Sequence, residues 1–122
     1  MLDHHKILAL FHIFLVAPLF FAIAFFKSSI PEWAYQAVLG LGVFVLVFHA
    51  YRLSVRWAQH SSYAWVNMIH VALVAPLLIY IGWNQKNTPR FAYELCIMTG
   101  FATLGYHMYS LVQSLNVVRA DD

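Results

Sequence analysis

Charged residues are scarce in this sequence. Only 10% of its 122 residues are Asp, Glu, Lys or Arg, whereas soluble domains carry roughly 25%. Hydrophobic residues make up 62%, and the formal net charge is only +2. This composition excludes a disordered chain and argues against a soluble α/β enzyme. It also argues against a nucleic-acid partner, because binding nucleic acid requires a strongly basic surface.

Cysteine is nearly absent, and the usual catalytic sets are missing. The single cysteine, Cys96, excludes an intrachain disulfide and any metal site built from cysteine alone. The chain has no glycine-rich phosphate loop, and its serines lie outside the predicted core. Glu32 and Glu94 fall at the opposite end of the predicted spans from the histidines that face inward. We therefore expect no hydrolytic or transfer enzyme, and at most an electron-transfer role.

Four apolar runs are long enough to cross a bilayer, whose hydrocarbon core of about 30 Å needs roughly 20 helical residues. They cover about residues 7–26, 33–51, 63–83 and 91–112. The four tryptophans fall at the run ends, as an interfacial aromatic belt requires: Trp33, Trp57, Trp65 and Trp83. We predict an all-α integral membrane protein, one multi-pass transmembrane domain over residues 1–122, with the lipid bilayer as its first partner.

The sequence aligns with itself when it is shifted by 58 residues, so that residue 12 falls on residue 70. Residues 12–53 match residues 70–111 without a gap, and 15 of the 42 aligned positions are identical. The repeats cover about residues 7–57 and 63–115, and each holds two spans. Both repeats therefore enter the membrane in the same direction. The pattern predicts a four-helix bundle of two parallel, tandem-duplicated two-helix units, with a pseudo-two-fold axis along the membrane normal.

Seven histidines are unusual in so apolar a chain. Four of them occupy paired repeat positions on one predicted helix face: His12, His49, His70 and His107. We expect these four to point inward at one depth, and a polar side chain in hydrocarbon marks a candidate functional site. The alternative is structural, because Pro18 and Pro76 lie mid-span, predict kinks and release carbonyls that a histidine can bind.

Bis-histidine haem b in electron transfer is the leading hypothesis. In a square bundle the diagonal helices lie about 14 Å apart, so His12 with His70, or His49 with His107, would supply the axial pair. Gly42 and Gly100 lie two turns before His49 and His107 and would admit the ring edge; close helix packing is the alternative explanation. The haem propionates would meet polar groups near the span ends: Arg52, Arg56, Tyr51 and Tyr109.

Three other functions fit the same pattern. Four imidazoles suit a single copper, zinc or iron ion. They also suit a proton or ion path, because histidine titrates near physiological pH, and Tyr35 and Tyr93 would extend a polar line. The last alternative is a non-catalytic packing subunit, in a homo-oligomer or a larger membrane complex.

Basic residues near the span ends predict the orientation. The side that carries both chain ends has Lys6, Arg52, Arg56 and Arg119, and the other side has Lys27, Lys86 and Arg90. Cytoplasmic loops carry the excess of Lys and Arg. We therefore expect both termini on the same, cytoplasmic side.

Overall fold

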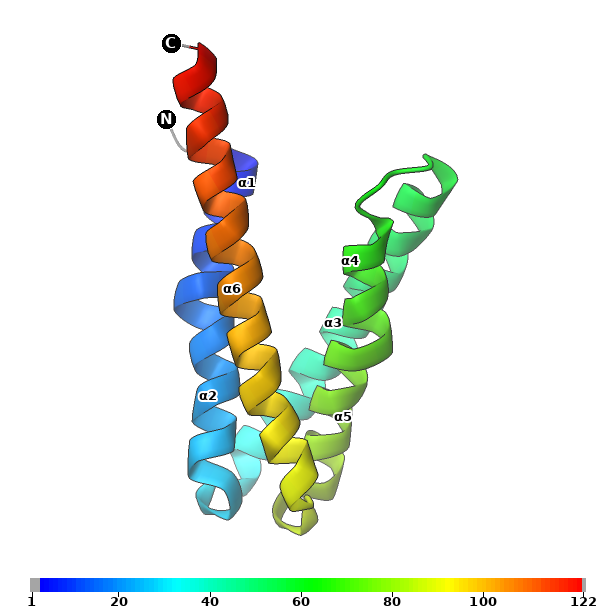
Figure 1. Ribbon diagram of the computed structural model, residues 1–122. Helices are drawn as coiled ribbons and strands as arrows, with labels where there is room; N and C mark the ends of the chain where they lie inside the picture. Colours follow the sequence, from blue (N-terminus) through cyan, green and yellow to red (C-terminus); the bar gives the residue numbers. More distant parts are fainter. Residues whose placement is uncertain (1–2, 122) are drawn as a thin grey trace. The chain divides into compact units, whose positions relative to one another are not determined.

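The computed structural model describes the backbone of residues 3–121 and the side chains of residues 3–116. This part of the chain is helical and contains no strand. Its elements, in chain order (Figure 1), are α1 (His4–Phe11), η1 (His12–Val16), α2 (Ala17–Phe26), η2 (Lys27–Ser29), α3 (Glu32–Ala58), α4 (Ala64–Ile69), η3 (His70–Val74), α5 (Ala75–Asn84), η4 (Gln85–Asn87) and α6 (Arg90–Asp121).

These elements join into four helices that are long and apolar enough to cross a membrane. They cover His4–Ser29, Glu32–Ala58, Ala64–Asn87 and Arg90–Asn116. The shortest has 24 residues, which at 1.5 Å per residue is about 36 Å and exceeds the hydrocarbon thickness. The prediction of four such helices is confirmed, and most helix ends extend beyond the predicted spans. Arg119, one of the basic residues counted for orientation, lies outside the described side chains.

Side-chain hydrogen bonds define where several helices begin and end. Asp3 caps the first helix, because its carboxylate accepts a 2.9 Å hydrogen bond from the Lys6 backbone N–H. At the other end, Lys27 has a φ of 47°, and its carbonyl accepts a 2.8 Å hydrogen bond from the Tyr35 hydroxyl. Gln85 has a φ of 52°, and its carbonyl accepts from the Thr88 hydroxyl at 2.6 Å. Both turns therefore use a left-handed residue whose carbonyl is held by a buried side chain.

The two mid-span prolines are each preceded by a π-helical segment, η1 before Pro18 and η3 before Pro76. The Ala17 N–H reaches five residues back to the His12 carbonyl, and the Ala75 N–H reaches back to the His70 carbonyl in the same way. Proline has no N–H to donate, so the regular hydrogen-bond ladder is interrupted at both places. The expected proline discontinuity thus takes the form of a π-helical turn that begins at a histidine.

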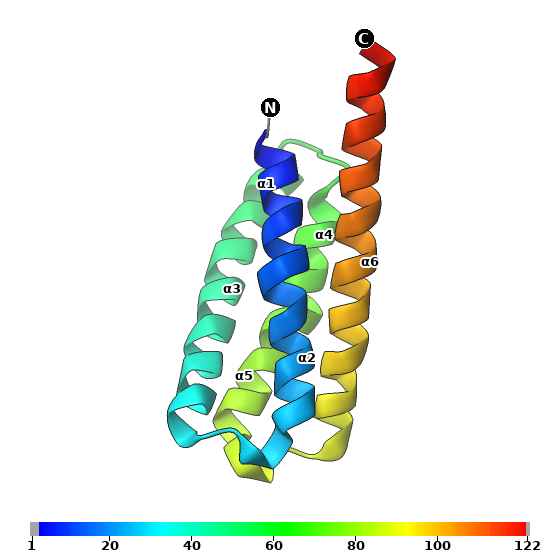
Figure 2. The same cartoon turned by 90° about the vertical axis from the view of Figure 1, so that its left-hand side faces the viewer.

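The described residues divide into two compact units. Unit 1 contains residues 3–26 and 93–121, and unit 2 spans Lys27–Ala92. Unit 1 pairs the first helix with α6, and unit 2 pairs α3 with the helix of α4 and α5; Figures 1 and 2 show that the helices of each pair run antiparallel. Both ends of the chain lie at the same end of unit 1 (Figure 2). Each unit therefore combines one helix from each predicted repeat.

Candidate functional site

The four repeat-paired histidines form two stacked pairs, one in each unit. In unit 1 the rings of His12 and His107 have centroids 4.2 Å apart and an interplanar angle of 20°. In unit 2 the rings of His49 and His70 have centroids 4.0 Å apart and an angle of 15°. His107 is buried, and the other three are partly buried. Each pair joins the two helices of its own unit.

One histidine of each pair is anchored to the turn that precedes it. His12 Nδ1 lies 2.8 Å from the Leu8 carbonyl oxygen, and His70 Nδ1 lies 2.7 Å from the Val66 carbonyl oxygen. A carbonyl oxygen only accepts, so each Nδ1 carries the proton and donates it. The basic nitrogen of each ring is therefore Nε2. A metal-ligating histidine is typically held in this way, with its second ring nitrogen donating to a carbonyl or carboxylate.

The anchored histidines are also the first residues of the π-helical segments. The backbone N–H of His12 is shared between the Leu8 and Ala9 carbonyls, and that of His70 between the Val66 and Asn67 carbonyls. The Leu8 and Val66 carbonyls thus each accept from the backbone and from the ring of the same histidine. π-Helical turns inside α-helices occur often at functional sites. The structure begins a π-helical segment at His12 and at His70, whereas His49 and His107 lie within the α-helices α3 and α6.

A stacked pair does not by itself hold iron between its rings. Two axial bonds of about 2 Å would put the ring centroids roughly 6 Å apart, with the nitrogens facing each other. The observed pairs are face to face at 4.2 and 4.0 Å. His12 with His107 and His49 with His70 are therefore packing partners, and the two axial pairings predicted from the sequence are different ones.

Gly42 and Gly100 lie at helix contacts within their units. A Cβ on Gly42 would meet Ile79 at 2.9 Å, and one on Gly100 would meet the Phe21 ring at 2.8 Å. The Phe21 ring also packs edge-on against Phe101, with centroids 4.9 Å apart. The room for a ring edge that the sequence suggested beside these glycines is filled by side chains. Close helix packing, the alternative left open by the sequence, explains both positions.

The predicted propionate contacts lie near the helix ends. Tyr51 is 66% exposed and Tyr109 is 62% exposed, and the Tyr109 hydroxyl accepts a 2.7 Å hydrogen bond from Gln113. Arg52 is partly exposed on α3. The buried Tyr35, expected to extend a polar line in a proton path, donates a hydrogen bond from its hydroxyl to the turn carbonyl of Lys27.

Asn67 is a buried polar residue that sequence reasoning missed. It is 3% exposed, and its Oδ1 accepts a 3.2 Å hydrogen bond from Arg56 Nη1. Its Nδ2 has no hydrogen-bond partner among the described residues. A signal was present, because Asn67 is a polar residue inside the third apolar run, three residues before His70, where the first repeat has Ala9.

Among the side chains of residues 3–116, no group of three or more His, Cys, Asp or Glu residues is arranged to hold a metal ion. No protein-family model matches the chain, and no curated protein or solved structure is significantly similar to it.

Proposed function

We propose that this chain is an integral membrane electron-transfer protein that binds haem b, with His12 and His70 as the axial ligands. The observation that carries the proposal is the pair of Nδ1–H to carbonyl hydrogen bonds, 2.8 Å at His12 and 2.7 Å at His70. They orient each ring and leave Nε2 as its basic nitrogen, the one that the proposal assigns to iron. Haem iron already has four porphyrin nitrogens, so it requires only two imidazoles from the protein. Each sequence repeat contains one imidazole anchored in this way, His12 in the first and His70 in the second.

The stacked partners have a supporting role in this proposal. His107 lies against one face of His12, and His49 lies against one face of His70. A ring that is hydrogen-bonded at Nδ1 and packed on one face has little freedom to rotate, which favours a ligand held in one orientation. Arg52, Tyr51 and Tyr109 remain the proposed contacts for the propionates. The bound group would supply reversible one-electron transfer.

The same hydrogen bonds argue against the alternative of proton conduction. A histidine that relays protons receives a proton on one ring nitrogen and releases one from the other. At His12 and His70 the Nδ1 proton is already engaged by a carbonyl of the same helix. Each relay step would break that bond inside an apolar span, at a cost of roughly 1–3 kcal/mol. Ligation at Nε2 leaves the bond intact.

We also infer that the chain is a tandem duplication. π-Helical segments recur at His12–Val16 and His70–Val74, and left-handed residues recur at Lys27 and Gln85. The same offset of 58 residues relates the two histidine stacks and the two glycine contacts, Gly42 with Ile79 and Gly100 with Phe21. These recurrences support the duplication independently of sequence identity. The predicted two-fold axis stays a prediction.

Titration of the purified protein with haemin tests the proposed ligands. The wild-type protein should give a low-spin, six-coordinate absorption spectrum. His12→Ala and His70→Ala should each give a high-spin, five-coordinate spectrum, because one axial ligand remains, and the double variant should not bind haem stoichiometrically. His49→Ala and His107→Ala remove the stacked partners but not the ligands, so they should stay low-spin with weaker haem binding.

Two outcomes would contradict the assignment. A low-spin spectrum that survives in His12→Ala and His70→Ala, but is lost in His49→Ala and His107→Ala, would move ligation to the other pair. Saturation with haemin that leaves every variant indistinguishable from the wild type would remove the four histidines from the site. His60→Ala, in the exposed turn between α3 and α4, controls for adventitious binding by a surface histidine.

A further inference from the structure

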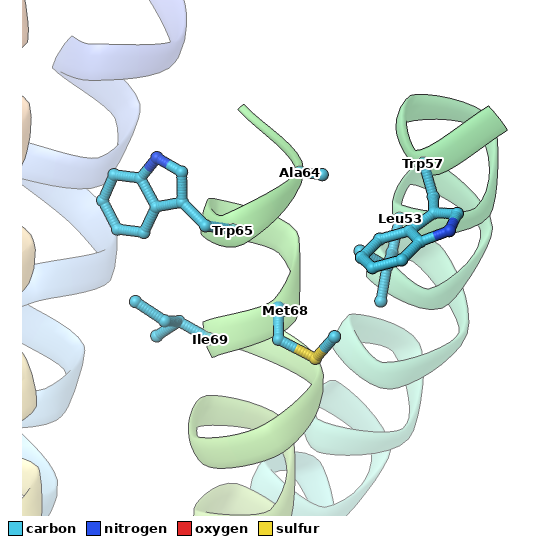
Figure 3. Close-up of a pocket in the computed structure, with 6 residues that line it drawn as sticks. All are labelled: Leu53, Trp57, Ala64, Trp65, Met68 and Ile69. Carbon is cyan, nitrogen blue, oxygen red and sulfur yellow. The ribbon is translucent and has the colours of Figure 1, made fainter. Parts of the chain in front are cut away.

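An apolar pocket opens on unit 2, where α3 ends and α4 begins. Its volume is about 360 Å³, within the roughly 300–1,000 Å³ of ligand pockets. Its lining has no charged side chain, and its only N–H donors are two indole nitrogens. The lining residues are Leu53, Trp57, Ala64, Trp65, Met68 and Ile69. Figure 3 shows Met68 extending from α4 toward Leu53 and Trp57 on α3. The pocket is therefore suited to a hydrocarbon chain.

Positive charge lies next to the pocket residues along α3. Arg52 and Arg56 are one helical turn apart on α3, and each immediately precedes a pocket residue, Leu53 or Trp57. No residue from 33 to 89 is acidic, so unit 2 has no carboxylate at this end of α3. Glu32 lies at the far end of the same helix, about 30 Å away at 1.5 Å per residue. Within unit 2, the two guanidinium groups thus have no carboxylate at their own end of α3.

Asn67 holds one of these cations against α4. Its Oδ1 accepts from Arg56 Nη1 at 3.2 Å, and its Nδ2 is a buried donor without a hydrogen-bond partner among the described residues. Asn67 and the pocket residues Ala64 and Met68 share α4. A guanidinium fixed in this way is a group that recognises phosphate oxygens.

This combination is absent at the corresponding positions of unit 1. At the offset of 58 residues, Arg56 corresponds to Ser114 and Asn67 to Ala9. Trp57 corresponds to Leu115 and Trp65 to Ile7, so both indoles are missing there as well. The charged, tryptophan-edged pocket is therefore a property of unit 2 and not a general consequence of pairing two such helices.

We propose that this end of unit 2 binds one anionic phospholipid, with the phosphate at Arg56, which Asn67 holds in place, and an acyl chain in the pocket. Trp57 and Trp65 are 69% and 52% exposed, and tryptophan at a span end lies at the level of lipid headgroups. Basic pockets between transmembrane helices at that level recognise anionic headgroups. The proposal involves no histidine and stands whether or not the chain binds haem.

Tryptophan quenching by brominated lipids tests the site. In a Trp33→Phe, Trp83→Phe background only Trp57 and Trp65 emit, and bromine on an acyl chain quenches an indole that it touches. At equal low mole fractions in phosphatidylcholine vesicles, brominated phosphatidylglycerol should quench more strongly than brominated phosphatidylcholine. Arg56→Gln should lower this preference about fivefold, the factor for one cationic side chain near a membrane surface. Equal quenching by the two lipids in the wild type would overturn the proposal.

Three variants separate a built site from diffuse attraction. Lys86→Gln removes one positive charge from the opposite end of unit 2 and should leave the preference unchanged; loss of the preference would indicate general surface charge. Ala64→Leu fills the pocket but keeps both arginines and should weaken quenching; an unchanged signal would exclude the acyl-chain assignment. Asn67→Leu keeps the Arg56 charge but removes its anchor, and should lower the preference in a protein whose helicity is unchanged.

A competition with inorganic phosphate distinguishes a lipid from a free anion. At matched ionic strength, phosphate should not displace the brominated lipid, because the pocket contributes binding that the free anion lacks. Displacement by phosphate alone would show that the headgroup contacts bind any phosphate, and would overturn the assignment of a lipid.

Discussion

At the scale of single residues, the chemistry of His12 and His70 is set by short-range neighbours. A carbonyl four residues earlier engages Nδ1, and a second imidazole covers one ring face at 4.2 or 4.0 Å. Neither contact requires a charged group. Each anchored ring is thus held in one orientation inside an apolar helix, as the proposed ligation of iron requires and a proton relay does not.

The sequence grouped the four histidines that the structure stacks in pairs, but it did not predict which of them would pair. Repeat position and helical periodicity placed His12, His49, His70 and His107 on inward faces. Periodicity states nothing about which helices are neighbours, so the His12–His107 and His49–His70 stacks were not foreseen. The Nδ1 anchors at Leu8 and Val66 were hidden for a related reason, because they depend on ring rotation and on the backbone where each π-helical turn begins.

Asp3 provides a prediction outside the membrane-spanning segments. The hydrogen bond from the Lys6 N–H holds the pKa of Asp3 below its ordinary value of 3.8. A lowered pKa in the folded state means that the carboxylate stabilises the helix start fully above about pH 3.8, and that this contribution is lost as the pH falls through the folded pKa. Amide hydrogen exchange at Lys6 should therefore accelerate, relative to the intrinsic rate, as the pH drops below 4.

Asp3→Asn is the matched variant, since asparagine caps helices about as well as aspartate but does not titrate in this range. Its protection at Lys6 should not change across the same acid range. If the wild type and Asp3→Asn lose protection together, the acid effect arises elsewhere in the chain.

At the scale of helical elements, glycine determines how closely the helices of unit 2 approach. A Cβ on Gly82 would lie 2.5 Å from the Leu39 backbone nitrogen and 2.7 Å from its Cα. Backbone atoms cannot rotate away as a side chain can, so α3 itself would have to shift. In lipid, small residues at contacts of this kind let two helices pack by van der Waals interaction.

Gly82→Ala should therefore destabilise the protein by about 1–3 kcal/mol, the usual cost of overpacking a close contact. Gly40→Ala is the control, because nothing lies within 4 Å of a Cβ at Gly40. That substitution should stabilise α3 by about 0.5–1 kcal/mol through helix propensity alone. Unfolding of both variants in detergent, followed by circular dichroism, gives the two values. Equal effects of the two substitutions would contradict the packing described for α5 against α3.

The sequence predicted the helices far better than their contacts. Run length and polar breaks were sufficient to locate four spans, because a bilayer imposes a minimum length. The glycines were ambiguous: Gly42 and Gly100 fitted both a cofactor edge and a helix contact, and only the positions of Ile79 and Phe21 decided the question. Pro18 and Pro76 indicated a discontinuity, but a sequence does not distinguish a simple kink from a π-helical turn.

At the scale of the whole molecule, four membrane-spanning helices give an even number of crossings. The short turns at Lys27–Ser29 and Gln85–Asn87 are then on one side, and the ends of the chain and the turn after Ala58 on the other. With the buried Cys96 replaced by alanine, single cysteines at Ser28 and Lys86 should react with an impermeant maleimide on intact cells. Single cysteines at His4 and Gln59 should react only after permeabilisation, if the positive-inside rule sets the orientation.

The reverse pattern, with His4 and Gln59 labelled on intact cells, would place the termini outside but keep the four crossings. Labelling of Ser28 and Lys86 from opposite sides would contradict the four-span arrangement itself. The native chain, whose only cysteine is buried, should remain unlabelled and supplies the background.

The absorption spectrum of the protein purified from haem-replete membranes tests the central claim most directly. The account predicts a Soret band that moves to longer wavelength and sharpens on reduction with dithionite, together with a distinct α band, and the loss of this low-spin signature in both His12→Ala and His70→Ala. A wild-type protein that stays folded and helical, yet remains colourless after haem is supplied, would contradict it.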